Sequence, residues 1–131
     1  MGKYAVALAG GALSGLFLAT ITGMFAGGLP SVAVFVAGGA ATATVIGRAR
    51  SWRRAAGTAC LVLALEGMVY PVAGLLSSGV APAGPEALPS GRLGLAFYEA
   101  SVDLKVVFGH LGFVLEPVLA TLAYLGLRRR R

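Results

Sequence analysis

Charge is scarce in this sequence, and negative charge is the scarcest. Only 12% of the 131 residues are charged, and just five residues are Asp or Glu. Soluble domains carry about 25% charged residues, because a water-facing surface needs them. With 57% hydrophobic residues and a mean hydropathy of +0.84, the chain lacks such a surface. The composition therefore predicts an integral membrane protein.

Metal-binding and nucleophilic side chains are nearly absent as well. The single cysteine, Cys60, excludes a disulfide within the chain and a cysteine-based zinc site. The single histidine, His110, supplies no recognisable metal-ligand set and does not justify a haem. The chain also lacks a phosphate-binding loop, an HExxH motif and a convincing Ser/His/Asp set. The sequence therefore predicts neither an enzyme nor a bound cofactor or metal.

Basic residues are more numerous and are concentrated in two clusters. Of the eleven, four lie in RARSWRR (48–54) and four in the terminal RRRR (128–131). Clusters beside apolar runs are typical of membrane orientation, whereas a scattered basic surface would favour nucleic acid. They also predict contact with anionic lipid. Arginine outnumbers lysine, and alanine and glycine abound, which indicates a prokaryote and hence its plasma (inner) membrane.

Four apolar runs alternate with short connections. They cover residues 4–25, 31–47, 55–76 and 106–127 of one domain, 1–131. A bilayer core of about 30 Å needs about 20 helical residues, so the second run is slightly short. The expected fold is an all-α integral membrane protein, built as a four-transmembrane-helix bundle.

The basic clusters predict the orientation of this bundle. The cluster 48–54 joins the second and third runs, and the terminal arginines follow the fourth, so both lie on one side of the membrane. Lys3 precedes the first run on the same side. Positively charged connections favour the cytoplasm. We therefore expect both termini to be cytoplasmic, with anionic lipid at that face.

The connection between the third and fourth runs, residues 77–105, has two parts. The first, SSGVAPAGPEALPSGR, is rich in proline and glycine and predicts irregular structure. In the second, 93–105, Glu99 and Asp103 share one helical face and apolar residues occupy the other. This pattern predicts a short amphipathic helix on the outer membrane surface or an extension of the fourth span.

The first run carries a small residue at every fourth position. In lipid such a stripe lets two helix backbones approach closely. The second run has comparable stripes, so the pattern predicts a tight hairpin of the first two spans, and a homodimer face is the alternative. The residues assigned to helix packing are Gly11, Gly15, Ala19 and Gly23.

Two glutamates interrupt the apolar runs. Glu66 lies midway along the third run and Glu116 midway along the fourth, so antiparallel spans place both near the midplane. A charged residue there costs about 2.5–3.5 kcal/mol on insertion scales. No Lys or Arg lies inside the four runs to neutralise it. We therefore expect both carboxyl groups to face the protein interior as a proton- or cation-binding pair.

Neighbouring residues extend this predicted site. Tyr70 is one helical turn from Glu66 and can donate a hydrogen bond to it. Pro71 and Pro117 each predict a kink close to a carboxylate, which is typical of spans that line a cavity. Further candidate donors are the hydroxyl groups of Thr20, Thr22, Thr42 and Thr44.

A stripe of titratable residues leads toward Glu116 along the fourth run. Glu99, Asp103 and His110 lie on roughly one face, which suggests an outer proton relay. The alternative is a solvated acidic face followed by a histidine in the headgroup layer. The sequence leaves both interpretations open.

Two functional classes follow from these features. The first is a small, oligomeric transporter or channel that couples protons or cations to the glutamate pair. The second is an accessory or assembly subunit of a larger membrane complex, without activity of its own. A purely structural explanation of the glutamates, as two protonated acids bonded across the spans, also stays open.

Overall fold

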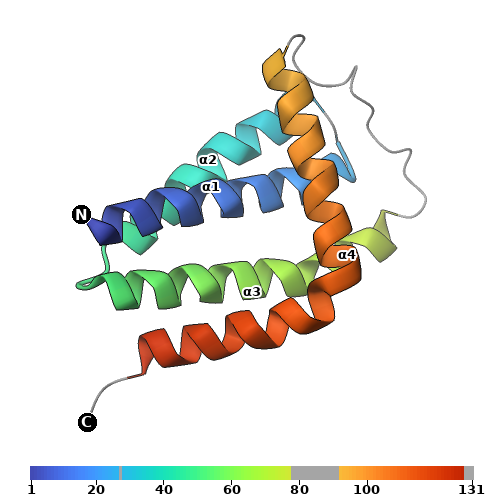
Figure 1. Ribbon diagram of the computed structural model, residues 1–131. Helices are drawn as coiled ribbons and strands as arrows, with labels where there is room; N and C mark the ends of the chain where they lie inside the picture. The colour runs from blue at the N-terminus through green and yellow to red at the C-terminus, as the bar shows by residue number, and fades with distance from the viewer. Residues whose placement is uncertain (27, 78–91, 129–131) are drawn as a thin grey trace.

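The computed structural model describes residues 1–26, 28–77 and 92–128, and all regular structure within them is helical. Its helices are α1 (Gly2–Gly23), α2 (Leu29–Gly47), α3 (Trp52–Leu76) and α4 (Arg92–Leu127) (Figure 1). Each contains a stretch long and apolar enough to cross a membrane, which confirms the prediction of an all-helical protein with four apolar spans. The connection predicted to be irregular falls mainly on residues 78–91, outside the described residues.

α1 and α2 pack closely through glycine. A Cβ added at Gly11 would lie 2.6 Å from the carbonyl oxygen of Gly39, and one at Gly15 would lie 2.5 Å from that of Phe35. Both positions are therefore direct contacts between backbones, the arrangement that small residues permit in lipid. Ala19, one turn after Gly15 in α1, is also buried.

The connection from α1 to α2 is short and has local causes. Gly28 adopts a φ of 77°, which favours glycine because an L side chain would clash there. Pro30 follows in the first turn of α2, where its missing N–H removes no helical hydrogen bond. Ser31 Oγ donates to the carbonyl of Ala26 at 3.1 Å and ties the two helix ends together.

α3 and the C-terminal half of α4 form the second pair. Ser51 caps α3, because its side chain accepts a hydrogen bond from the Arg54 N–H at 3.3 Å. At this end of the pair two glycines touch: a Cβ added at Gly126 would lie 2.6 Å from the Cα of Gly57. The backbones of α3 and α4 are therefore in contact where α4 ends.

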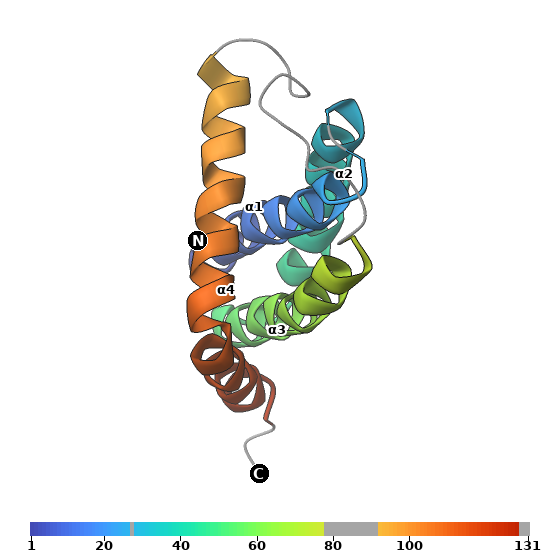
Figure 2. The ribbon, with the colours of Figure 1, turned by 90° about the vertical axis from the view of Figure 1, so that its right-hand side faces the viewer.

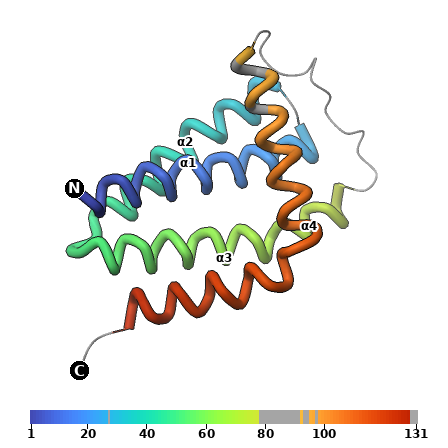
Figure 3. The backbone as a smooth tube through the Cα atoms, in the orientation of Figure 1, coloured from blue at the N-terminus to red at the C-terminus, as the bar shows by residue number. Residues whose placement is uncertain are grey.

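α4 bends in its middle. Its C-terminal half follows α3, whereas its N-terminal half runs across α1 and α3 instead of along them (Figures 2 and 3). Pro117 lies inside this helix, where it lacks an N–H and where, in a straight helix, its ring would clash with the carbonyl of Phe113. The predicted outer segment, 93–105, is continuous with α4 and is not a separate helix.

The start of α1, the start of α3 and the end of α4 lie at one end of the bundle. A Cβ added at Gly2 would lie 3.8 Å from the Cβ of Trp52, so α1 and α3 begin side by side. Arg53 Nη2 donates to the carbonyl of Leu125 at 2.7 Å, which brings the end of α4 to the same place. Lys3 and the cluster 48–54 therefore share one end of the protein with the end of α4. The cytoplasmic location of this end stays a prediction.

Candidate functional site

A chain of hydrogen bonds crosses three helices in the middle of the bundle. Ser14 Oγ on α1 donates to Glu66 Oε1 on α3 at 2.5 Å. Ser14 Oγ also lies 2.9 Å from Thr42 Oγ1 on α2. A serine hydroxyl has one hydrogen, so Thr42 must donate to Ser14 while Ser14 donates to Glu66. Such chains strengthen each bond by polarisation in a medium of low polarity.

Ser14 has no exposed surface, so this chain is internal to the protein. Leaving a buried hydroxyl or carboxylate unpaired costs about 1–3 kcal/mol. The bond between Ser14 Oγ and Glu66 Oε1 avoids that cost for both atoms, because each of them is paired. The chain therefore fixes the rotation of α1 relative to α3, because only one face of α1 carries the serine.

The fourth helix enters the same layer through Glu116. Its Oε1 atom occupies the space beside Gly67, where a Cβ would collide with the carboxylate. Gly67 directly follows Glu66 in α3, so the two carboxyl groups lie at one level of the bundle. Their surroundings differ, because Glu66 reaches α1 and Glu116 lies against the backbone of α3.

Each glutamate keeps one buried oxygen without a partner. Within the described residues, neither Glu66 Oε2 nor Glu116 Oε1 has a hydrogen-bond partner, and both atoms are buried. Most buried polar atoms in proteins are paired, so two exceptions in one layer require an explanation. A carboxylate oxygen of this kind can take up a proton or contact a cation.

Glu116 also lines a cavity of about 460 Å³ between α3 and α4. The remaining walls are mainly apolar and aromatic, with three glycines that leave room at the surface of the helices. The lining residues are Gly67, Met68, Tyr70, Pro71, Phe108, Gly109, Gly112, Phe113 and Glu116.

Three aromatic rings close the layer on the side of Tyr70. Phe17 of α1 is buried and lies between Tyr70 of α3 and Phe108 of α4. Its ring centroid is 6.2 Å from that of Tyr70 and 4.5 Å from that of Phe108, both edge-to-face. Aromatic pairs favour this edge-to-face geometry. The contact of Phe17 with Phe108 joins the N-terminal half of α4 to α1.

The donor to Glu66 is Ser14, which was not among the predicted donors. The ring of Tyr70, a predicted donor, packs on Phe17 and lines the cavity. Of the four threonines, only Thr42 joins the site, and it does so through Ser14. The other three donate to carbonyl groups one turn back in their own helices: Thr20 to Leu16, Thr22 to Leu18 and Thr44 to Ala40.

The predicted outer relay is not assembled around Glu116. Glu99, Asp103 and His110 are exposed on the N-terminal half of α4, and they are not among the residues that line the cavity. His110 Nδ1 donates to the carbonyl of Val106 at 2.9 Å. In the described part of the chain, His, Cys, Asp and Glu form no group of three or more that could hold a metal ion.

Sequence reasoning missed two residues of this site. Ser14 is the one serine in α1, and its position three residues after Gly11 on the small-residue side was an available signal. Gly67 carries no such signal, because its role appears only when Glu116 is placed against it.

Comparison with known proteins identifies no match to this chain. No protein-family model, curated protein sequence or solved structure matches the chain.

Proposed function

We propose that the protein is a small transporter or channel that couples protons or cations to Glu66 and Glu116. The observation that carries the proposal is the pair of buried, unpartnered oxygens, Glu66 Oε2 and Glu116 Oε1, in one layer of the bundle. A carboxyl group kept only for structure gains most when both of its oxygens are hydrogen-bonded. Vacant positions suit a group that exchanges a proton or cation.

The surroundings support exchange in three respects. The four apolar runs, 4–25, 31–47, 55–76 and 106–127, hold no Lys or Arg that would neutralise the carboxylates permanently. Glu116 faces a cavity, which provides a place for an incoming ion or substrate. Ser14 and Thr42 are hydroxyls, and a hydroxyl can reverse its donor and acceptor roles when the proton on Glu66 changes.

Infrared titration of the carboxyl groups in nanodiscs tests this proposal. We expect a protonated-carboxyl band that changes between about pH 5 and pH 9, as coupled carboxyl groups at functional sites do. Glu66→Gln and Glu116→Gln should each remove one component and shift the other. Glu99→Gln removes an exposed acid from α4 and should leave the band unchanged. If both carboxyl groups stay protonated throughout, they are structural groups and the proposal fails.

Flux measurements provide a second test of the proposal. Proteoliposomes with a trapped pH dye should show proton movement that both glutamine variants abolish while remaining folded. Wild-type flux in both variants would also overturn the proposal.

The second candidate function is an accessory subunit of a larger membrane complex. The observation that favours it is the N-terminal half of α4, which runs across the bundle and exposes Val106, Val107 and Leu111 by 53%, 41% and 52%. A partner should then co-purify in fixed ratio and be lost from Leu111→Ser but not from Leu8→Ser, an equally apolar exposed site on α1. Purification of the chain alone in active form would exclude this candidate.

A further inference from the structure

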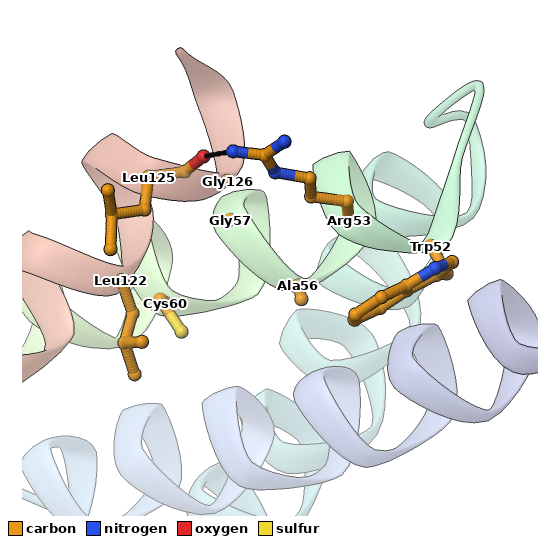
Figure 4. Close-up of a pocket in the computed structure, with 8 residues that line it drawn as sticks. All are labelled: Trp52, Arg53, Ala56, Gly57, Cys60, Leu122, Leu125 and Gly126. Atoms are coloured by element: carbon orange, nitrogen blue, oxygen red, sulfur yellow. Dashed lines mark hydrogen bonds between the residues drawn. The ribbon is translucent and has the colours of Figure 1, made fainter.

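A second hollow lies at the basic end of the bundle, away from the carboxylates. It is a groove of about 220 Å³ between the first turns of α3 and the last turns of α4 (Figure 4). Drug-sized ligands occupy about 300–1,000 Å³, so the groove is too small for one and suits a narrow chain. Its lining residues are Trp52, Arg53, Ala56, Gly57, Cys60, Leu122, Leu125 and Gly126.

The two ends of the groove differ in chemistry. Trp52 and Arg53 lie at the end of the bundle, and Cys60 and Leu122 lie further inside (Figure 4). From Trp52 to Cys60 is eight residues of helix, or about 12 Å at 1.5 Å per residue. That length is close to half of a bilayer core of about 30 Å. The groove therefore has a polar mouth and an apolar interior, as deep as most of one lipid leaflet.

Arg53 supplies the positive charge at the mouth. Its guanidinium reaches from α3 to α4 and donates one hydrogen bond to Leu125, near the C-terminal end of α4 (Figure 4). This bond satisfies a carbonyl that has no partner within its own helix and places a cation at the negative end of the helix dipole. A guanidinium has five N–H groups, so several stay available for a phosphate.

Among the described residues, no acid balances the positive charge at this end. Arg54 and Arg128 are exposed here as well. Within the described residues the acids all lie elsewhere: Glu66 in the middle of α3, and the others before the last three turns of α4. The mouth of the groove is thus complementary to an anion.

We propose that this groove binds one acyl chain of an anionic phospholipid, with the lipid phosphate on Arg53. A free phosphate ion would pair with Arg53 but leave the apolar walls uncovered. An uncharged or zwitterionic lipid would cover the walls without supplying net negative charge for the arginines. An anionic amphiphile provides both. The proposal is independent of ion coupling at Glu66 and Glu116, because it uses other residues at another level of the bundle.

Trp52 provides a direct assay, because it is the single tryptophan of the chain and lines the groove. The full chain is placed in phosphatidylcholine nanodiscs that contain either phosphatidylglycerol or phosphatidylcholine with brominated acyl chains, which quench tryptophan on contact. We expect brominated phosphatidylglycerol to quench at an about fivefold lower mole fraction, the preference conferred by one basic residue near the membrane surface.

Three variants distinguish a specific lipid site in the groove from general electrostatic attraction between the basic residues and anionic lipid. Arg53→Gln should abolish the preference for phosphatidylglycerol. Arg48→Gln removes the same charge at the end of α2, outside the groove, and should retain it. Ala56→Leu keeps every charge but fills the groove, and should also abolish the preference. Ala56→Leu keeps the test valid if Arg53→Gln does not fold.

Several results would overturn the proposal. Equal quenching by the two brominated lipids would show that the groove selects no anion. Equal losses in Arg53→Gln and Arg48→Gln would show diffuse electrostatic attraction. Removal of the preference by added inorganic phosphate would identify a site for the free anion instead of a lipid.

Discussion

Replacing Ser14 by alanine is the sharpest test of the hydrogen bonds that link Thr42, Ser14 and Glu66. The change removes the donor to Glu66 Oε1 and the acceptor for Thr42, while it leaves the helix and the apolar contacts in place. Hydrogen bonds between membrane helices average about 0.6 kcal/mol and reach about 1.7 kcal/mol. A bond to a charged acceptor contributes about 1.5–3 kcal/mol. With two bonds lost, we expect the free energy of unfolding to fall by about 1–3 kcal/mol.

The assay is reversible unfolding in mixed micelles with increasing SDS, followed by circular dichroism. Thr44→Ala is the matched control, because the Thr44 hydroxyl is exposed and donates only to Ala40 in its own helix, at 2.8 Å. Exposed changes of this kind usually stay within about 0.5 kcal/mol. A double-mutant cycle with Glu66→Met, whose side chain has a similar length but no carboxyl or amide oxygen, then isolates the contact between Ser14 and Glu66.

Two results would refute this reasoning. Ser14→Ala could cost no more than Thr44→Ala, which would mean that the chain of hydrogen bonds contributes nothing to stability. Alternatively, its cost could be the same with and without the Glu66 carboxyl group. In that case the effect of Ser14 would come from packing and not from its bond to the glutamate.

Glycine contacts supply two further predictions, measured by the same unfolding assay. Gly15→Ala should destabilise the protein by about 1–3 kcal/mol, because the new Cβ forces α1 away from the Phe35 carbonyl. Gly67→Ala should displace the carboxylate of Glu116 at a smaller cost, because the end of a flexible side chain can move where a backbone carbonyl cannot. Gly74→Ala is the control for both, since a Cβ there meets nothing within 4 Å and should stabilise the helix by about 0.5–1 kcal/mol. Equal stability of all three variants would contradict the close contacts.

The helices and the level of the glutamates could be predicted because they depend on local properties. Apolar runs of sufficient length predict helices in a membrane without any knowledge of their neighbours. Counting residues along two antiparallel runs places Glu66 and Glu116 at a common depth. The contact of Glu116 with Gly67, the residue after Glu66, agrees with that count.

The position of Ser14 on the small-residue side of α1 indicates a place between helices, but its partner could not be predicted, because that depends on how α1 is rotated. A hydroxyl inside a helix can bond the carbonyl four residues earlier, as those of Thr20 and Thr22 do. Ser14 instead points to α3. Sequence alone gives no means of telling these two behaviours apart.

The shape of α4 was predictable only in part. Pro117 predicts a bend, but proline does not fix the direction in which the preceding half of the helix travels. That direction follows from tertiary contacts such as Phe108 on Phe17, with ring centroids 4.5 Å apart. The contact of Gly57 with Gly126 was likewise hidden, since single glycines among 20 in the chain form no pattern.

The two helix pairs differ in the conformational entropy that they lose on packing. The α1–α2 contact is made largely by Gly11, Gly15 and Gly39, which have no rotamers to restrict. The α3–α4 pair, in contrast, holds Arg53 in one conformation against Leu125. Ordering an arginine side chain costs about 1.5–2 kcal/mol in lost rotamer freedom, whereas ordering glycine or alanine side chains costs essentially none. The first pair can therefore associate with no side-chain entropy cost at its closest contacts, whereas the second must recover that cost through the hydrogen bond of Arg53.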